Sequence, residues 1–349
     1  MLSLIDYITA APKAELHLHL EGAIRPATIL ELAERNGVNL PAITLAELSE
    51  WFIFRDFKTF VTVYGTLSNC LITTDDFELI TVQLAEELVS QNVKYAEVTF
   101  TPSTHYNRGI CQKVFFDGLT RGREKARKMG LEINWVFDIS RGIEDAEMRN
   151  ALADYTVGVA LEGKEEGVIA LGLGGQEAGF PPQLFQHQFS RGIAGGLHST
   201  PHAGEVVGPA SVWDALNYLQ AERIGHGVRS IEDPQLVAYL AERQIPLEIN
   251  PTSNLLLGIY PDLDQHPLPH LMAAGVPVSV NSDDPALFGT TLTRELTLLS
   301  GEFGFDLESI DQILLNPIRH SFLDKARKES LEKMFLTSLQ GLKQKYLTN

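Results

Sequence analysis

The chain has 349 residues, of which 44% are hydrophobic and 21% are charged, a balance typical of a folded globular protein rather than a disordered one. With 28 Lys and Arg against 45 Asp and Glu, the formal net charge is −17, which argues against a general binder of nucleic-acid phosphates or of anionic membrane surfaces. No stretch approaches the roughly 20 apolar residues of a membrane span, and no signal-peptide pattern opens the chain. Together with only 2 cysteines, these features predict a cytoplasmic protein without nucleic-acid or membrane partners.

Short apolar segments rich in β-formers alternate with longer segments of helical periodicity. The predicted strands cover residues 14–20, 93–100, 131–138, 168–173, 196–202, 223–226, 246–250 and 276–281. Strands separated by helices in this way predict an α/β fold, and eight of them predict one closed (β/α)8 TIM barrel domain over residues 1–349. An open doubly wound sheet is the alternative, although no G-x-G-x-x-G motif follows the first strand directly.

The interval between the first two predicted strands is long for a single crossover connection. It carries a series of aromatic side chains that includes Phe57, Phe60 and Tyr64. We therefore expect extra helices inserted after the first strand, with a helical lid at about residues 45–90. The alternative is that these helices only pack against the outside of the barrel.

Histidines and a carboxylate gather where predicted strands end. His17 and His19 are two positions apart on the first strand, so their imidazoles project to the same side. His202 ends the fifth strand and Asp283 follows the eighth, and barrel active sites lie at these carboxyl ends. Three histidines and one carboxylate suit a single Zn²⁺ with an open position for water, with other divalent metals as alternatives. The fourth strand has no lysine to bridge two metals, which favours one metal ion per subunit.

Neighbouring polar groups have the chemistry that a hydrolytic site needs. Glu205, on the loop after the fifth strand, could deliver a proton to the group under attack. His226 lies between two glycines and could orient the water or stabilise a developing oxyanion. Asp283 could accept the proton of the water, while Asp284 either contacts the substrate or caps the helix that follows.

Six short motifs resemble those of the adenosine deaminase family, occur in the family's order and are spread over nearly the whole sequence. They are HLHLEG (17–22), GGQE (174–177), HAGE (202–205), RIGHG (223–227), NPTSN (250–254) and SDDP (282–285). The resemblance implies a barrel enzyme that hydrolyses the 6-amino group of a purine nucleoside to a 6-oxo group and releases ammonia, with water activated by one zinc ion.

The resemblance also assigns roles to individual positions. It implies zinc ligands at His17, His19, His202 and Asp283, catalytic residues at Glu205, His226 and Asp283, and substrate contacts from His19, Glu21, Gly175 and Asp284. Glu205 would protonate N1 of the purine, Asp284 would contact N7, and the Gly175 amide would contact N3.

Two departures from the family pattern lie beside the substrate rather than beside the metal. Glu21 stands where adenosine deaminases usually carry Asp, and residues 172–177 read GLGGQE where the family commonly reads DLAGDE. Adenosine is the first expectation for the substrate, and aminodeoxyfutalosine, methylthioadenosine and adenine are the alternatives. A 5′ extension on the sugar would need a pocket that opens near Glu21. A different metal-dependent hydrolase and a non-catalytic purine-binding protein are the other classes, and the sequence does not predict an oligomeric state.

Overall fold

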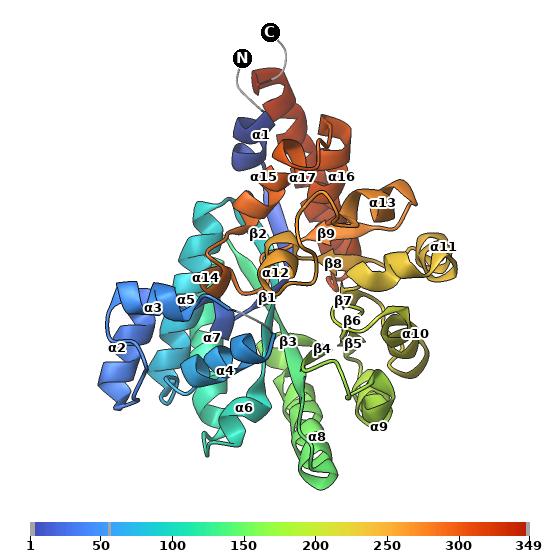
Figure 1. Cartoon of the computed structure of the whole chain (residues 1–349). Coiled ribbons are helices and arrows are strands. Elements are labelled where there is room, and N and C mark those ends of the chain that lie inside the picture. The colour runs from blue at the N-terminus through green and yellow to red at the C-terminus, as the bar shows by residue number, and fades with distance from the viewer. Residues whose placement is uncertain (1–3, 55–56, 347–349) are drawn as a thin grey trace.

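The computed structural model describes residues 4–54 and 57–346, and Figure 1 shows parallel strands at the centre with helices around them. A first sheet runs in the order β1 (Lys13–His19), β2 (Val93–Phe100), β3 (Glu132–Arg141), β4 (Val168–Gly175) and β5 (His198–Ser199). A second sheet runs in the order β6 (His202–Ala203), β7 (Ile224–His226), β8 (Leu247–Ile249) and β9 (Val278–Val280). Every pairing within the two sheets is parallel.

Both seams between the two sheets are closed. β5 and β6 belong to one predicted strand that Thr200 and Pro201 interrupt, so the chain itself joins one sheet to the other. At the second seam, Asp283 N donates to His17 O at 3.1 Å and His19 N donates to Asp283 O at 2.8 Å. The predicted closed barrel is therefore confirmed, and the open doubly wound sheet is wrong.

Amphipathic helices form the outer layer of the barrel. They are α5 (Thr74–Ser90), α7 (Gln112–Lys128), α8 (Ala146–Glu162), α9 (Gln186–Ala194), α10 (Pro209–Tyr218), α11 (Pro234–Arg243), α13 (Leu268–Ala273) and α16 (Leu307–His320). Local sequence starts several of them, since Asp145, Asp233 and Asp306 each accept a backbone N–H of the first turn. The two ends of the described chain lie side by side, where α1 (Leu4–Ala10) contacts α15 (Leu292–Gly301) and α17 (Lys325–Tyr346).

The expected insertion after the first strand consists of α2 (Pro26–Asn36), α3 (Leu45–Trp51) and α4 (Phe57–Ser68). α5, which the predicted lid of about residues 45–90 includes, packs instead against α7 and β2 in the outer layer. Within the predicted lid, every residue that lines the central cavity belongs to α4. The segment that covers the cavity is thus shorter than the sequence suggested.

Shorter helices follow several strand ends on the same face as the cavity. They are α6 (Pro102–Tyr106), α12 (Pro251–Leu256) and α14 (Pro285–Phe288). Phe288 of α14 stacks on Phe60 of α4 with ring centroids 5.3 Å apart, which ties the inserted helix to the barrel. None of the described helices combines the length and the hydrophobicity needed to cross a membrane.

Candidate active site

The four predicted metal ligands converge at the carboxyl ends of β1, β6 and β9. His19 Nε2 lies 3.2 Å from His202 Nε2 and 3.4 Å from Asp283 Oδ1, and His17 Nε2 lies 3.3 Å from that same oxygen. All four side chains are buried, and His17 Nε2 has no hydrogen-bond partner among the described residues. Buried nitrogen and oxygen ligands that face one another this closely are costly unless a cation lies between them. The set therefore fits a divalent metal ion. The candidate ligand atoms of His17, His202, His226 and Asp283 lie within 4.8 Å of one another, and so do those of His19, Asp283 and Asp284.

Unusual backbone conformations aim two of the site residues. His226 has φ 60° and Asp283 has φ 62°, both in the left-handed region that non-glycine residues rarely adopt. Such strain persists only where the surrounding structure holds it, and the paired hydrogen bonds between Asp283 and β1 do so here. Strain at both positions is typical of a functional site rather than of a structural turn.

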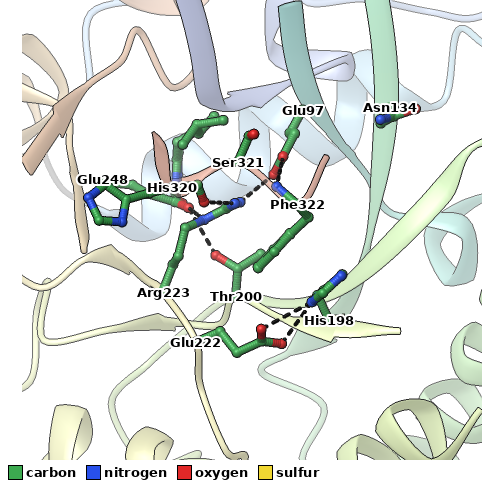
Figure 2. Close-up of polar contacts among 12 residues, drawn as sticks. Glu97, Asn134, His198, Thr200, Glu222, Arg223, Glu248, His320, Ser321 and Phe322 are labelled. Carbon is green, nitrogen blue, oxygen red and sulfur yellow. Dashed lines mark hydrogen bonds and ion pairs between the residues drawn. The ribbon is translucent and has the colours of Figure 1, made fainter. Parts of the chain in front are cut away.

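A chain of buried charges supports His17. His17 Nδ1 contacts Glu248 Oε2 at 2.9 Å, which fixes the ring and turns its Nε2 toward the site. Glu248 Oε1 accepts from Arg223 Nε at 2.7 Å, and the same guanidinium pairs with Glu97 (Figure 2). His198 is four positions before His202 on the same predicted strand, so its side chain points to the same side. It lies at the other end of the barrel, where it pairs with Glu222.

Glu205 lines the cavity on a loop that a second glutamate holds in place. The Glu177 carboxylate accepts N–H bonds from Gly204, Val206 and Val207 at 2.6 to 2.8 Å. Burial, followed by the negative charges of Asp283 and Glu177, raises the pKa of Glu205 to about 8. A carboxyl with this pKa keeps its proton at neutral pH and is therefore suited to act as a general acid.

His226 is held as a neutral hydrogen-bond donor. Asn250 Nδ2 donates to His226 Nδ1 at 3.3 Å, which leaves the ring proton on Nε2. That Nε2 lies 3.8 Å from Glu205 Oε2 and 3.9 Å from Asp283 Oδ2. Burial lowers the pKa of His226 to about 3, so the imidazole is uncharged at neutral pH.

Asp284 lies in the cavity wall next to a glycine that makes room for it. A Cβ at Gly22 would collide with the Asp284 side chain, which explains the glycine in the HLHLEG motif. Burial and the charge of Asp283 raise the pKa of Asp284 well above its usual range, so this carboxyl can donate a hydrogen bond. Gly175 also lines the cavity, at the end of β4, with φ 84°.

Glu21 lies behind the cavity wall instead of in it. Its Oε2 accepts a hydrogen bond from Tyr64 Oη at 3.2 Å, and its Oε1 lies 3.0 Å from His105 Nε2. Tyr64 lines the cavity, whereas Glu21 is absent from the residues that do. Glu21 is therefore hydrogen-bonded to a residue of the cavity wall, and its direct contact with the substrate stays a prediction.

Asp138 and Arg141 of β3 line the cavity, and the sequence reasoning missed both. A Cβ at Gly172 would lie 2.9 Å from Asp138 Oδ1, and one at Gly174 would collide with Oδ2, so the glycines of β4 leave space for this carboxylate. Asp138 Oδ1 and two guanidinium nitrogens of Arg141 have no hydrogen-bond partner within the described residues. Asp138 and Arg141 therefore bring unpaired polar atoms to the same cavity that the predicted site residues line.

The sequence reasoning assigned no role to four buried supporting residues. They are Glu97, Glu177, Glu248 and Asn250. Glu177 and Asn250 lie within the GGQE and NPTSN motifs, and Glu248 and Asn250 alternate with apolar residues on the seventh predicted strand, so that both face the barrel interior. For Glu97 the sequence offers only an acidic residue within a predicted strand.

Comparison with known proteins supplies the evolutionary context of this site. The family model for adenosine deaminase matches residues 12–336 of the chain. The chain belongs to the adenosine deaminase family. It is 41% identical over 328 residues to an aminodeoxyfutalosine deaminase of Streptomyces avermitilis, a match that covers 93% of this chain and 90% of that relative.

Solved structures of relatives share the fold. An adenine deaminase from Arthrobacter aurescens superposes with a TM-score of 0.89 at 32% identity, covering 95% of this chain and 100% of that one. An amidohydrolase from Burkholderia ambifaria, solved with bound Zn, superposes with a TM-score of 0.90 at 27% identity, covering 100% of this chain and 96% of that one. These relatives support a deaminase of 6-aminopurines with a metal site, while adenosine as the substrate is less well supported than the alternatives.

Proposed function

We propose that this protein is a zinc-dependent deaminase that converts the 6-amino group of aminodeoxyfutalosine, a purine nucleoside with a 5′ extension, to a 6-oxo group. The observation that carries the proposal is the 41% identity to an aminodeoxyfutalosine deaminase over 93% of the chain.

In this proposal His17, His19, His202 and Asp283 hold one zinc ion. Their buried, convergent nitrogens and carboxylate match the ligand preferences of Zn²⁺. Such an ion lowers the pKa of a bound water toward about 7 and so supplies a nucleophile at neutral pH.

The protein groups around the purine supply its protons and its orientation. Glu205 donates its proton to N1, which makes C6 more electrophilic. Asp284, which holds its own proton, donates to N7, and the backbone N–H of Gly175 binds N3. His226 donates through Nε2 to the oxygen that attacks C6, and the Asp283 carboxylate accepts the proton of that water.

The experiment compares kcat/KM of the zinc-loaded protein for aminodeoxyfutalosine, methylthioadenosine, adenosine and adenine, followed as ammonia release. We expect aminodeoxyfutalosine to have the highest value. A higher kcat/KM for adenosine would restore the reading that the family resemblance first suggested. No ammonia from any of the four purines would refute a deaminase altogether.

Adenine is the second candidate substrate, and a specific observation favours it. The adenine deaminase of Arthrobacter aurescens matches 95% of this chain with a TM-score of 0.89. Its identity of 32% is lower than the 41% shared with the aminodeoxyfutalosine deaminase. The same kinetic comparison separates the two, since a free base lacks the sugar and its 5′ group.

A further inference from the structure

A buried carboxyl of β3 lines the active-site cavity and has no role in the proposed mechanism. Asp138 is 3% exposed, and its Oδ1 has no hydrogen-bond partner within the described residues. A buried polar atom is costly when it stays unpaired, so we looked for the substrate group that pairs with it. We propose that Asp138 recognises the ribose 2′-hydroxyl of the nucleoside and selects ribonucleosides over 2′-deoxyribonucleosides. This inference rests on the proposed function, because it concerns the substrate of the same site.

Two glycines of the neighbouring strand leave the space that this carboxyl occupies. β3 and β4 lie side by side, and Asp138 is opposite Gly172 in their register (Figure 1). A Cβ at Gly172 would lie 2.9 Å from Asp138 Oδ1, and a Cβ at Gly174 would collide with Oδ2. The family pattern DLAGDE would place a carboxylate at 172 and a methyl group at 174, whereas this chain reads GLGGQE. The carboxyl in this space thus comes from β3 instead of β4.

The place of the carboxyl beside Gly174 indicates which part of the substrate it meets. The next residue, Gly175, also lines the cavity and is the proposed backbone donor to N3 of the purine. In a purine nucleoside, N3 and the ribose lie on the same edge of the base, and the 2′-hydroxyl is the sugar hydroxyl nearest to N3. A side chain that reaches Gly174 from the adjacent strand therefore lies next to N3, on the side where this hydroxyl is found.

The protonation state of Asp138 suits a hydroxyl partner. Burial raises the pKa of Asp138 to about 8, against the opposing charge of Arg141, so the carboxyl keeps its proton at neutral pH. A neutral carboxyl donates through its O–H and accepts through its other oxygen. A hydroxyl likewise donates one hydrogen bond and accepts others, so each group can satisfy the other.

Arg141 lines the same cavity and supplies further donors. It is 4% exposed and opposite Gly175 in the register of β3 and β4, and its Nε and Nη1 have no hydrogen-bond partner in the described part of the chain. The negative charges that act on it come from Glu177, Asp138 and Glu205. Because a hydroxyl is uncharged, it is neither repelled by these carboxyls nor attracted as an ion by the guanidinium. Its binding depends on the unpaired polar atoms that Asp138 and Arg141 present.

The test compares adenosine, 2′-deoxyadenosine and 3′-deoxyadenosine with the zinc-loaded full chain, followed as ammonia release. For the wild-type protein we expect kcat/KM of adenosine to exceed that of 2′-deoxyadenosine by about 30-fold, because the deoxy sugar leaves buried polar groups unpaired. This quotient is the ribo-to-deoxy ratio. The value for 3′-deoxyadenosine should lie closer to that of adenosine than to that of 2′-deoxyadenosine.

Substitutions of Asp138 separate recognition from structural support. In Asp138→Ala the ribo-to-deoxy ratio should fall to about one, and taking the ratio within one enzyme cancels any general loss of activity. Asp138→Asn keeps one donor and one acceptor, so its ratio should stay well above that of Asp138→Ala. Asp75→Ala removes a carboxylate whose side chain is 82% exposed on α5 and should leave the ratio at the wild-type value.

Glycine substitutions move the carboxyl without removing it. In Gly172→Ala the new methyl group would lie 2.9 Å from Asp138 Oδ1, so the carboxyl must shift and the ribo-to-deoxy ratio should fall. The matched control is Gly158→Ala in α8, where a Cβ would meet Arg191 Nη2 at 3.7 Å, an ordinary contact. This control should keep the wild-type ratio.

Two outcomes would overturn the role of Asp138. One is a ribo-to-deoxy ratio of about one in the wild-type protein, or a ratio that Asp138→Ala leaves unchanged. The other is a greater loss for 3′-deoxyadenosine than for 2′-deoxyadenosine, which would place a different hydroxyl at this carboxyl. If no deamination occurs at all, calorimetry with the same three nucleosides still measures the preference. A preference for the ribonucleoside in binding that Asp138→Ala removes would then uphold the role of Asp138 while the proposed function fails.

Discussion

At the scale of single residues, burial gives otherwise ordinary carboxyls opposite protonation states within one cavity. Glu205 is buried without a cationic partner in contact, and burial with the charges of Asp283 and Glu177 raises its pKa to about 8. The hydrogen bond and the charge of His17 lower the pKa of Asp283 despite its burial. Pairs of carboxyls whose pKa values are driven apart in this way supply the acid and the base of a hydrolytic reaction.

The Glu205→Gln variant tests the proposed acid. Glutamine keeps the shape of the side chain but cannot transfer a proton, so kcat should fall by about 10²- to 10⁴-fold. Zinc content, measured by atomic emission, should remain that of the wild type because Glu205 is not a proposed ligand. Turnover close to the wild-type rate would rule out Glu205 as the acid.

The pH profile tests the protonation state of the same group. Because the pKa of Glu205 is raised to about 8, the protonated form dominates below that pH and is lost as the pH rises through it. We expect kcat/KM to be level near neutrality and to decline above about pH 8, approaching tenfold per pH unit. The matched control is Glu205→Gln, whose residual activity should lack this alkaline decline. A decline that persists in the variant would assign it to another group.

At the scale of elements, the strands position the side chains at their carboxyl ends. The loops that follow the strands need hydrogen bonds from other residues to hold their shape. Glu177, after β4, accepts three backbone N–H bonds from residues 204–207 and a bond from Ser211 Oγ at 2.5 Å. One buried carboxylate thus fixes the loop that carries Glu205. The helices of the outer layer do not contribute to this contact, apart from the Ser211 hydroxyl of α10.

Glu177→Gln should therefore act on catalysis through the position of Glu205. An amide offers one acceptor oxygen and presents N–H groups where the loop also presents N–H groups, so the loop should shift. We expect kcat to fall about tenfold or more at unchanged zinc content, with a stability loss of about 2 kcal/mol. Glu144→Gln, an exposed carboxylate after β3, is the control and should change neither quantity. Wild-type kcat in Glu177→Gln would show that the loop holds its position without this carboxylate.

At the scale of the whole molecule, one arginine joins distant parts of the barrel. Arg223, before β7, pairs with Glu97 of β2 and with Glu248 of β8, and it donates to His320 O at 2.8 Å. Both carboxylates are buried, and the ring of Phe322 covers the guanidinium at 3.7 Å. Through Glu248 this network continues to His17 and so links β2 and β8 to one of the proposed metal ligands.

Arg223→Met tests this coupling. Removing the cation leaves two buried carboxylates without their partner, which should cost about 3–5 kcal/mol of unfolding free energy. Urea denaturation followed by circular dichroism measures the loss, and zinc affinity should fall as Glu248 loses its orientation. Arg327→Met breaks the exposed pair with Glu132 and should cost less than about 1 kcal/mol. Equal losses in the two variants would contradict a special role for Arg223.

The sequence by itself determined the barrel and the residues at its strand ends. The strand segment 168–173, VIALGL, appears as a continuous apolar run because parallel strands in a barrel are buried on both faces. His17 and His19 share a face because side chains of a strand alternate with a period of two. Both properties depend on local periodicity, so residues close together in the sequence suffice to predict them.

Tertiary structure alone decided which buried groups meet. Glu248 contacts His17 across 231 positions of the sequence, and the space for Asp138 exists only because Gly172 and Gly174 lie on the adjacent strand. Tyr64, from an inserted helix, lines the cavity and donates a hydrogen bond to Glu21 across 43 positions of the sequence. Such contacts depend on strand register and on the docking of helices, which are settled by packing over the whole barrel rather than by any local pattern.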